Sequence, residues 1–558
     1  MIKNNIKVLL RSRFVLGSMI ILSGFVIFEI LALYGKKWPV TEPLGNAMTL
    51  SVYLFIAMMF IAYEYMRNFF NNGVAEIVNV LDKKGKNVIS AFLIIGLYSS
   101  LLCLCITILV IYEFLYYKIS DPNHEYILHI ILAVFLNIYM VMILASIIGT
   151  TLACIKNRIA VYSIITMMTL FSSPFAENVA YSIDMASLSN GSMVGKIVFK
   201  IISFFYIMPR FNMRAMPRAE FGEPILPYRF CIILFWILFF VFIGFILRKK
   251  KKIYIVSSVT LCLIMFIGFN TPASRMDDKL DAYQNGIPDT LYVTSGMYQE
   301  KIKRPDYKIN EYDMKLSIKS NLTADIAMKV SNSLQQYDMT LYRKYIVYDV
   351  ENQNGEKLKY KQFGDYISIY NRKQLDITEI RIKTKGNSSD CYANYQGCYL
   401  PGYYLYYPRA GFVDVYNMTY GSIIPNFVSE KTLFKVEVFP KKDYISNLPK
   451  IGNKYVGKCD GFTLVRGFYK KKNLGNGNVL VYPYLDEFTI HDGKKSEEEC
   501  WDDSFQLSSE QLKKDKIKNS IIFKDPGVLD GDAYGFKAYG KNQIFVNVGG
   551  AFYYSDDN

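Results

Sequence analysis

Long apolar stretches alternate with short polar breaks over the first 270 residues, and this pattern stops beyond that point. Seven stretches are close to the ~20 residues that a helix needs to cross a ~30 Å hydrocarbon layer. From Thr271 onward no stretch approaches this length. The pattern therefore predicts a membrane half and a soluble half. We place the predicted spans at residues 14–34, 48–65, 88–115, 126–155, 159–180, 230–247 and 253–269.

The second half shows a different pattern, in which polar and apolar residues alternate one by one from about Tyr292. "YKINEYDMKLSIKS", "ITEIRIKTKG" and "TLFKVEVFP" have this period of two, with Gly, Asn, Pro and Asp between them. Such alternation is typical of half-buried β-strands joined by turns. Residues 271–558 are therefore expected to form an all-β domain of sandwich type.

The distribution of basic residues predicts the orientation of the spans, because short cytoplasmic loops are rich in Lys and Arg. A basic run lies between the last two spans, at Arg248, Lys249, Lys250, Lys251 and Lys252. It is too short to track nucleic-acid phosphates, so we interpret it as a topology anchor among anionic headgroups at the cytoplasmic face. With a cytoplasmic N-terminus and seven spans, the β-rich domain is extracytoplasmic. An amphipathic stretch at 193–208 is expected to lie along the membrane interface; if it crossed, this orientation would reverse.

The connection between the second and third spans carries a distinctive set of residues. It begins with Glu64 and Arg67, breaks at Gly73, and continues as a short amphipathic segment that includes Glu76 and Leu81. Lys83 and Lys84 then lead into the next span. From spacing alone, an ordinary solvated connection explains these residues.

The basic N-terminal helix, the six spans and this connection together have a layout that resembles that of the permeases of type-2 ABC exporters. The resemblance covers residues 1–250, and Glu64, Gly73, Glu76 and Leu81 fill the places of the family's acidic, glycine, acidic and apolar positions. It implies that 1–252 is a six-span permease core with an N-terminal elbow helix. It also implies a coupling helix at about 68–86, external amphipathic helices at about 183–228 and an added seventh span at 253–270.

A permease of this type needs an ATPase, and no G-x-x-x-x-G-K-[ST] motif occurs in the chain. The nearest segment, "DKKGKN", lacks the first glycine and the hydroxyl that would hold magnesium. The resemblance therefore implies separate ABC ATPase subunits that bind ATP and magnesium, and no cofactor in this chain. It also implies a second copy of the permease or a related permease.

Glu29, in "FVIFEILAL", is the clearest ionisable residue inside a predicted span. Charge within a bilayer is costly, so such residues are candidates for function. One interpretation is that Glu29 lines a translocation path for a cationic substrate. The other is a carboxyl that is protonated or hydrogen-bonded across a helix interface.

Four of the nine cysteines, Cys391, Cys398, Cys459 and Cys500, lie in the predicted β domain. An even number in an oxidising compartment suggests disulfides, and four cysteines allow three pairings. Cys391 and Cys398 could close the short loop "CYANYQGC", which would leave Cys459 with Cys500. A zinc site formed by these cysteines is disfavoured, since they lack C-x-x-C spacing. A zinc site of the H-E-x-x-H type is also disfavoured, because "HEYILH" separates its histidines by five positions instead of four.

Residues 309–470 resemble the non-catalytic N-terminal β-sandwich of the zinc aminopeptidase family. Leu400, Pro401, Tyr407 and Pro408 match its Leu-Pro and Tyr-Pro signature. The catalytic domain with H-E-x-x-H is absent from this sequence, so the resemblance implies a binding surface without hydrolysis.

The resemblance to type-2 ABC permeases implies a permease subunit of an ATP-driven exporter in the plasma membrane, which is expected to move or confer resistance to a peptide or amphipathic substrate. The Lys-, Ile-, Asn- and Tyr-rich composition suggests a low-GC Gram-positive bacterium. The alternative is a membrane-anchored receptor or sensor whose β-sandwich binds a ligand, although seven spans exceed what an anchor needs.

Overall fold

The structure is a computed structural model of the whole chain. It describes residues 2–31, 42–70, 86–116, 124–173, 227–247, 252–270, 302–386, 391–415, 430–483 and shorter pieces elsewhere. The chain divides into two compact units, which we treat separately. The helical unit comprises Met1–Pro217 and Gly222–Arg275, and the β unit comprises Arg218–Phe221 and Met276–Asn558.

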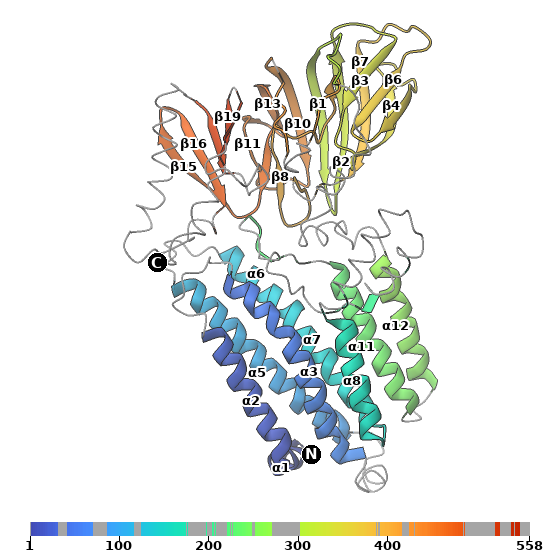
Figure 1. Cartoon of the computed structure of the whole chain (residues 1–558), viewed down its shortest axis with the longest axis vertical. Helices are drawn as coiled ribbons and strands as arrows, with labels where there is room; N and C mark the ends of the chain where they lie inside the picture. Colours follow the sequence, from blue (N-terminus) through green and yellow to red (C-terminus); the bar gives the residue numbers. More distant parts are fainter. Residues whose placement is uncertain are drawn as a thin grey trace. The chain divides into compact units, whose positions relative to one another are not determined.

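The helical unit is a bundle of long apolar helices (Figure 1). Its helices are α1 (Ile2–Arg11), α2 (Arg13–Leu31), α3 (Glu42–Phe70), α5 (Lys86–Tyr116), α6 (His124–Val134), the π-helix η1 (Phe135–Tyr139), α7 (Met140–Leu152), α8 (Arg158–Ser172), α11 (Pro227–Leu247) and α12 (Lys252–Asn270). The short α1 has charged and apolar residues on different faces, whereas the longer helices are apolar around most of their circumference.

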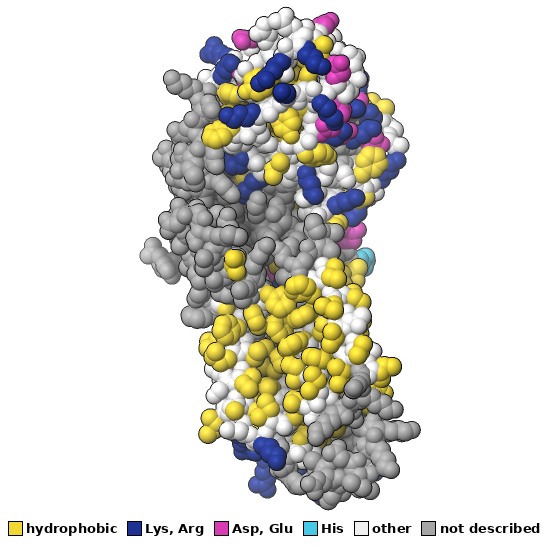
Figure 2. All heavy atoms as spheres, turned by 90° about the vertical axis from the view of Figure 1, so that its right-hand side faces the viewer, with side chains coloured by type: hydrophobic (Ala, Val, Ile, Leu, Met, Phe, Trp, Pro, Cys, Tyr) yellow, Lys and Arg dark blue, Asp and Glu magenta, His cyan; other side chains and the backbone are white. Residues whose placement is uncertain are grey.

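Among the described residues, five helices are long and apolar enough to cross a membrane. These candidate spans are Arg13–Leu31, Ala47–Phe70, Val88–Tyr112, His124–Leu152 and Pro227–Leu247, and they coincide with five of the seven predicted spans. The other two predictions fall on shorter apolar helices, Arg158–Ser172 and Ile253–Gly268. Figure 2 shows hydrophobic side chains covering the visible face of the helical unit, as expected for a multi-pass membrane protein.

Small residues allow α3 and α7 to pack closely. Ala145 and Gly149 lie four positions apart on α7, the small-xxx-small spacing that lets membrane helices approach. A Cβ atom built on Gly149 would overlap the Met59 carbonyl oxygen and lie 2.9 Å from the Ala62 Cβ atom. The backbones of α3 and α7 are therefore in contact at a position that only glycine fills without a clash.

The β unit consists of short strands in several sheets (Figure 1). In chain order the strands are β1 (Ile309–Ile318), β2 (Leu322–Val330), β3 (Gln336–Thr340), β4 (Ile346–Asn352), β5 (Lys359–Phe363), β6 (Tyr366–Tyr370), β7 (Glu379–Gly386), β8 (Cys398–Leu400), β9 (Arg409–Ala410), β10 (Thr432–Phe439), β11 (Ile445–Ser446), β12 (Lys450–Ile451), β13 (Lys454–Cys459), β14 (Leu464–Arg466), β15 (Tyr469–Gly475), β16 (Asn478–Pro483), β17 (Ile521–Lys524), β18 (Lys537–Tyr539) and β19 (Gln543–Val546).

The described strands form a seven-stranded sheet in the order β12-β13-β10-β1-β2-β7-β4 and three smaller sheets. The smaller sheets have the orders β11-β14-β8, β15-β16-β17-β19-β18 and β5-β6-β3-β9. Within the large sheet β1 pairs in parallel with β10, and the other pairs are antiparallel. Residues of β10 alternate strictly between buried and partly exposed as far as Val438, which confirms the strand predicted from "TLFKVEVFP".

Tyrosines fill much of the core of the β unit. The ring of Tyr312 stacks on Phe434 with centroids 4.8 Å apart, and its hydroxyl donates to the Pro408 carbonyl over 3.0 Å. Leu400 and Tyr407 of the aminopeptidase-like signature are fully buried, and Tyr407 packs edge-on against Tyr312. Leu400 and Tyr407 of the signature are therefore part of the packed core of this unit. Each tyrosine hydroxyl that is buried there needs a hydrogen-bond acceptor.

The predicted disulfide between Cys391 and Cys398 does not form in the structure, where Cys391, Cys398 and Cys459 are free thiols. The hairpin register explains this, because Cys398 pairs with Ala393 and lies diagonally from Cys391. Diagonal neighbours across two strands are ~7–8 Å apart, beyond the usual ~4.4–6.8 Å between bridged Cα atoms. Cys500 lies outside the described residues.

Candidate functional site

Polar side chains gather around the last two turns of α3. Glu64 and Tyr65 are consecutive, so their side chains point about 100° apart around the helix axis. Glu64 contacts α8 and Tyr65 contacts α1. We call the six residues joined in this way the α3 cluster: Asn5, Glu64, Tyr65, Ser90, Arg158 and Tyr162.

On one side, α8 provides the partners of Glu64. Asn157 caps α8 by accepting hydrogen bonds from the backbone nitrogens of Ile159 and Ala160, at 3.0 and 3.4 Å. This cap fixes the first turn of α8. Arg158 and Tyr162 follow at i and i+4 and therefore share one face of the helix.

The Tyr162 hydroxyl donates to Oε1 of Glu64 over 2.7 Å, and Nη2 of Arg158 lies 3.6 Å from Oε2. The Glu64 side chain is 14% exposed and that of Arg158 is 56% exposed. The Tyr162 ring also packs on Phe60 and Tyr63 of α3, with centroids 5.3 and 5.9 Å apart. The hydrogen bond from Tyr162 is the stronger polar link, since an ion pair with a half-exposed arginine contributes little.

On the other side, α1 links α3 to α5. The Tyr65 hydroxyl donates to the backbone carbonyl of Asn5 over 3.0 Å, and the Asn5 side-chain amide donates to the Ser90 hydroxyl. Asn5 is 4% exposed, although most of α1 is exposed. Asn5 therefore holds α1 against the end of α3 and the beginning of α5.

The α3 cluster lies at both ends of the connection that spans residues 71–85. Phe70 ends α3 and Lys86 begins α5, and both helices are held through Asn5. A displacement of this connection would therefore act on α1 and α8 as well as on the two helices that it joins. The arrangement is suited to transmitting movement among four helices.

The predicted coupling residues fall partly within this cluster. Glu64 is central to it. Arg67 follows one turn later on α3, half-buried, and its Nε and Nη1 atoms have no hydrogen-bond partner among the described residues. The remaining predicted coupling residues, Gly73, Glu76, Leu81, Lys83 and Lys84, lie outside the described residues.

Other predicted site residues lie apart from the α3 cluster. Glu29 is exposed on α2, whereas Val26 and Ile30 of the same helix are buried. Within this single copy its carboxyl therefore points away from the bundle. Of the basic run, Arg248, Lys249, Lys250 and Lys251 lie outside the described residues, and α12 begins at Lys252. Most of the predicted external helices at 183–228 also lie outside them.

Sequence reasoning missed most of the cluster's partners. Asn157 followed by Arg158 is a recognisable start of a helix, and with it the i, i+4 position of Tyr162 could have been noted. No local pattern identifies Asn5 or Ser90, because their pairing joins positions 85 residues apart. Among the described residues, no group of three His, Cys, Asp or Glu side chains is placed to hold a metal ion.

No protein-family model matches the chain, and no curated protein matches it. Solved structures give a distant match to M1 zinc peptidases. An M1 zinc metallopeptidase from Deinococcus radiodurans is 10% identical, with a TM-score of 0.28, over 44% of this chain and 62% of that chain. Yeast LTA4 hydrolase in complex with bestatin is 15% identical, with a TM-score of 0.28, over 47% of this chain and 44% of that chain. The match thus spans less than two thirds of either relative.

Proposed function

We propose that this chain is the transmembrane permease subunit of an ATP-driven exporter in the plasma membrane of a low-GC Gram-positive bacterium. The observation that carries the proposal is the α3 cluster, which ties both ends of the 71–85 connection to α1 and α8. A partner protein that moves the 71–85 connection can move the helices only if the connection is linked to them, and the contacts of the α3 cluster provide these links.

In this proposal, residues 68–86 form the surface for separate ABC ATPase subunits, which bind ATP and magnesium. Movement on that surface passes through Glu64 to α8 and through Tyr65, Asn5 and Ser90 to α1 and α5. A second permease, either another copy or a related chain, completes the translocation path. The exposed position of Glu29 suits a path between two permeases, because its carboxyl faces outward from a single copy.

The β unit is proposed to lie outside the cell as a sandwich-type domain that binds a peptide, an amphipathic substrate or a partner protein. No peptidase activity is proposed for it.

The direct test is to purify the full-length chain from its native membranes in a mild detergent and measure ATP hydrolysis. We expect a P-loop ATPase to co-purify, and we expect the reconstituted complex to transport substrate in vesicles. Glu76→Lys should leave ATP hydrolysis measurable but abolish transport. Transport unchanged by Glu76→Lys would contradict the assigned coupling segment, and a preparation without any ATPase would favour a membrane-anchored receptor.

The orientation can be tested with a membrane-impermeant maleimide on intact cells. Lys357→Cys places a thiol on an exposed strand connection of the β unit, and Lys7→Cys places one on the exposed face of α1. We expect labelling at position 357 in intact cells and at position 7 only after lysis. The unsubstituted chain provides the background, and the reverse result would overturn the proposed topology.

A further inference from the structure

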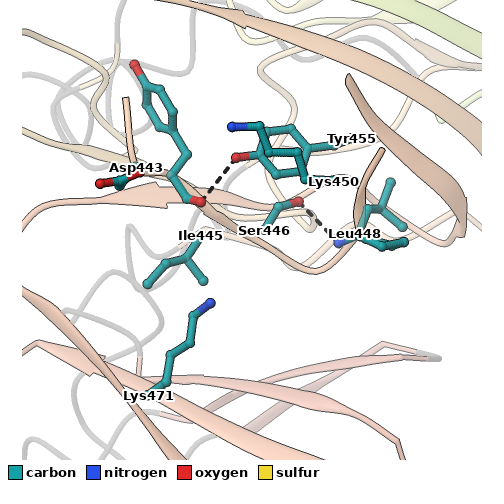
Figure 3. A pocket seen from close by; sticks show the side chains of 9 residues that line it. Asp443, Ile445, Ser446, Leu448, Lys450, Tyr455 and Lys471 are labelled. Carbon is teal, nitrogen blue, oxygen red and sulfur yellow. Dashed lines mark hydrogen bonds between the residues drawn. The ribbon is translucent and has the colours of Figure 1, made fainter. Parts of the chain in front are cut away.

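The β unit contains a pocket of about 430 Å³ bordered by strands of three different sheets (Figure 3). β11, β12 and β15 contribute Ile445, Lys450 and Lys471 to its lining. Each of these strands is the terminal strand of its sheet. A volume of this size is within the usual range for ligand pockets, about 300–1,000 Å³.

One wall of the pocket is apolar. Ile445, Leu448 and Pro449 supply aliphatic surface, and the Tyr455 ring adds an aromatic face. The segment that carries them is fixed locally. The Tyr455 hydroxyl donates to the Tyr444 carbonyl over 3.1 Å, and the Leu448 backbone nitrogen donates to the Ser446 hydroxyl over 3.2 Å. The wall therefore offers a locally fixed apolar surface for an aliphatic or aromatic side chain.

Two ammonium groups border the same space. Figure 3 shows the Lys471 side chain directed toward Ile445, and Lys450 lies over the Tyr455 ring with its nitrogen 5.9 Å from the ring centroid. Neither lysine forms an ion pair with a described residue. A negatively charged group in this pocket would be attracted by both ammonium groups, and a hydrogen bond to either one would be charge-assisted.

The surroundings are also basic. Arg466 lies over the Tyr444 ring at 5.9 Å and donates to the Tyr395 carbonyl over 3.0 Å. Partial burial, followed by the charge of Arg466, lowers the pKa of Lys442 below its ordinary value. Among the described residues of the lining, Asp443 is the single acidic one. The excess of cations around one carboxylate favours an anionic ligand.

The terminal strands determine which anion fits. A terminal strand has backbone N–H and C=O groups along one side that its own sheet does not pair, so an extended chain can bind there by β-augmentation. Among the described strands, β12, for example, pairs with β13 alone, through Lys450 opposite Tyr455 and Ile451 opposite Lys454. A small inorganic anion would use the lysines but neither the strand edge nor the apolar wall.

We propose that this pocket binds the C-terminal end of an extended peptide whose last side chain is apolar. The terminal carboxylate lies between Lys450 and Lys471, the last side chain packs on Leu448 and Pro449, and the preceding backbone runs along a terminal strand. The proposal concerns this pocket alone and holds whether or not the chain transports a substrate.

The test uses the full-length chain in an uncharged detergent and a peptide with N-terminal fluorescein, the sequence Gly-Ser-Gly-Ser-Leu and a free carboxylate. Binding is followed by fluorescence anisotropy at low salt. We expect the C-terminally amidated peptide to bind at least about tenfold more weakly, since a charge-assisted hydrogen bond is lost. Lys450→Gln and Lys471→Gln should each weaken the binding of the free-acid peptide by a similar factor.

Lys472→Gln is the matched control, because Lys472 is the next residue on β15, carries the same charge and does not line the pocket. It should leave the affinity unchanged, and unchanged thermal unfolding of all three variants would show that they fold. Equal binding of the acid and amide peptides, or an equal loss in the Lys472 variant, would overturn the proposal. An affinity for acetate equal to that for the peptide would overturn it as well, since the pocket would then bind anions without recognising a chain end.

Discussion

Tyr162 donates its hydroxyl hydrogen to the Glu64 carboxylate over 2.7 Å, and this bond joins α8 to α3 within the helical unit. The carboxylate is almost buried, at 14% exposure, so it depends on partners to replace the water that it has lost. Arg158 reaches the same carboxylate from a more exposed position, 3.6 Å away. The Tyr162 hydroxyl is therefore the main hydrogen-bond partner of Glu64. Of the two predicted coupling residues that the structure describes, Glu64 and Arg67, Glu64 is the one that belongs to the α3 cluster.

Tyr162→Phe should destabilise the helical unit. The substitution keeps the ring contacts with Phe60 and Tyr63 but removes a hydrogen bond to a charged acceptor, which costs about 1.5–3 kcal/mol. Thermal unfolding of the full-length protein in detergent measures the effect. Tyr53→Phe is the control, since Tyr53 is half-exposed and its edge-on contact with Phe25 does not need the hydroxyl. Equal melting temperatures of the two variants would contradict the assigned role of Tyr162.

Gly149→Ala should separate α3 from α7. The added methyl group would overlap the Met59 carbonyl oxygen, and backbone atoms cannot move aside as a flexible side chain can. We expect a loss of about 1–3 kcal/mol in the free energy of unfolding, which is typical of an overpacked interior.

Gly96→Ala on α5 provides the matched control, because a Cβ atom there meets nothing within 4 Å. It should raise stability by up to about 1 kcal/mol, since alanine favours a helix more than glycine does. The two variants are compared by thermal unfolding in the same detergent. A Gly149→Ala protein as stable as Gly96→Ala would show that α3 and α7 are farther apart than the structure places them.

The parts of the fold that depend on a repeating pattern could be predicted from the sequence. Five spans were predicted within a few residues because their apolar composition continues for the whole width of a bilayer. The β10 strand was predicted because each second residue from Thr432 to Val438 is apolar or small and buried. Such patterns are local, so they can be recognised without knowledge of the tertiary contacts.

Contacts between distant positions could not be predicted in this way. The sequence around Ser90 does not indicate that this residue pairs with Asn5. Likewise, no pattern in α1 selects Asn5 over Asn4. The Cys391–Cys398 disulfide was wrong for a related reason. Spacing showed that a short loop could close, but the register that sets Cys398 opposite Ala393 depends on how the hairpin turns.

The three described cysteines of the β unit should react as buried free thiols. Cys391, Cys398 and Cys459 are each 0% exposed, and burial raises the pKa of the Cys459 thiol to about 12. Because the thiolate is the reactive form, we expect almost no maleimide labelling of these three cysteines in the folded protein at neutral pH.

Denaturation should expose all three thiols to maleimide without a reducing agent, as peptide mass spectrometry would show for each site. Cys154, which is partly exposed and follows the span His124–Leu152, serves as an internal reference for the labelling reaction. If Cys391 and Cys398 became labelled only after reduction, they would be bridged in the protein, and the hairpin register would have to differ from the one described.

Glu311 should contribute stability to the β unit at neutral pH that is lost in acid. Its carboxylate on β1 accepts hydrogen bonds from Lys435 over 2.7 Å and from Lys329 over 3.1 Å. The Lys435 hydrogen bond, opposed by partial burial and assisted by Lys329, holds the pKa of Glu311 below its ordinary value. A depressed folded-state pKa means that the unfolded chain binds the proton more readily, so folding is favoured wherever the carboxyl is ionised.

This contribution is fully present above the unfolded pKa of about 4.3 and disappears as the pH falls through the lower, folded value. Glu311→Gln should therefore reduce the free energy of unfolding most at pH 6–7, roughly, and the difference from the unsubstituted protein should shrink steadily below about pH 4. Urea unfolding followed by near-UV circular dichroism of the buried tyrosines measures this difference. Glu430→Gln is the control, since Glu430 and its partner Lys308 are 68% and 66% exposed and such a pair adds little at any pH. A Glu311→Gln effect that stayed constant from neutral to acid pH would mean that the carboxyl acts through packing and not through its charge.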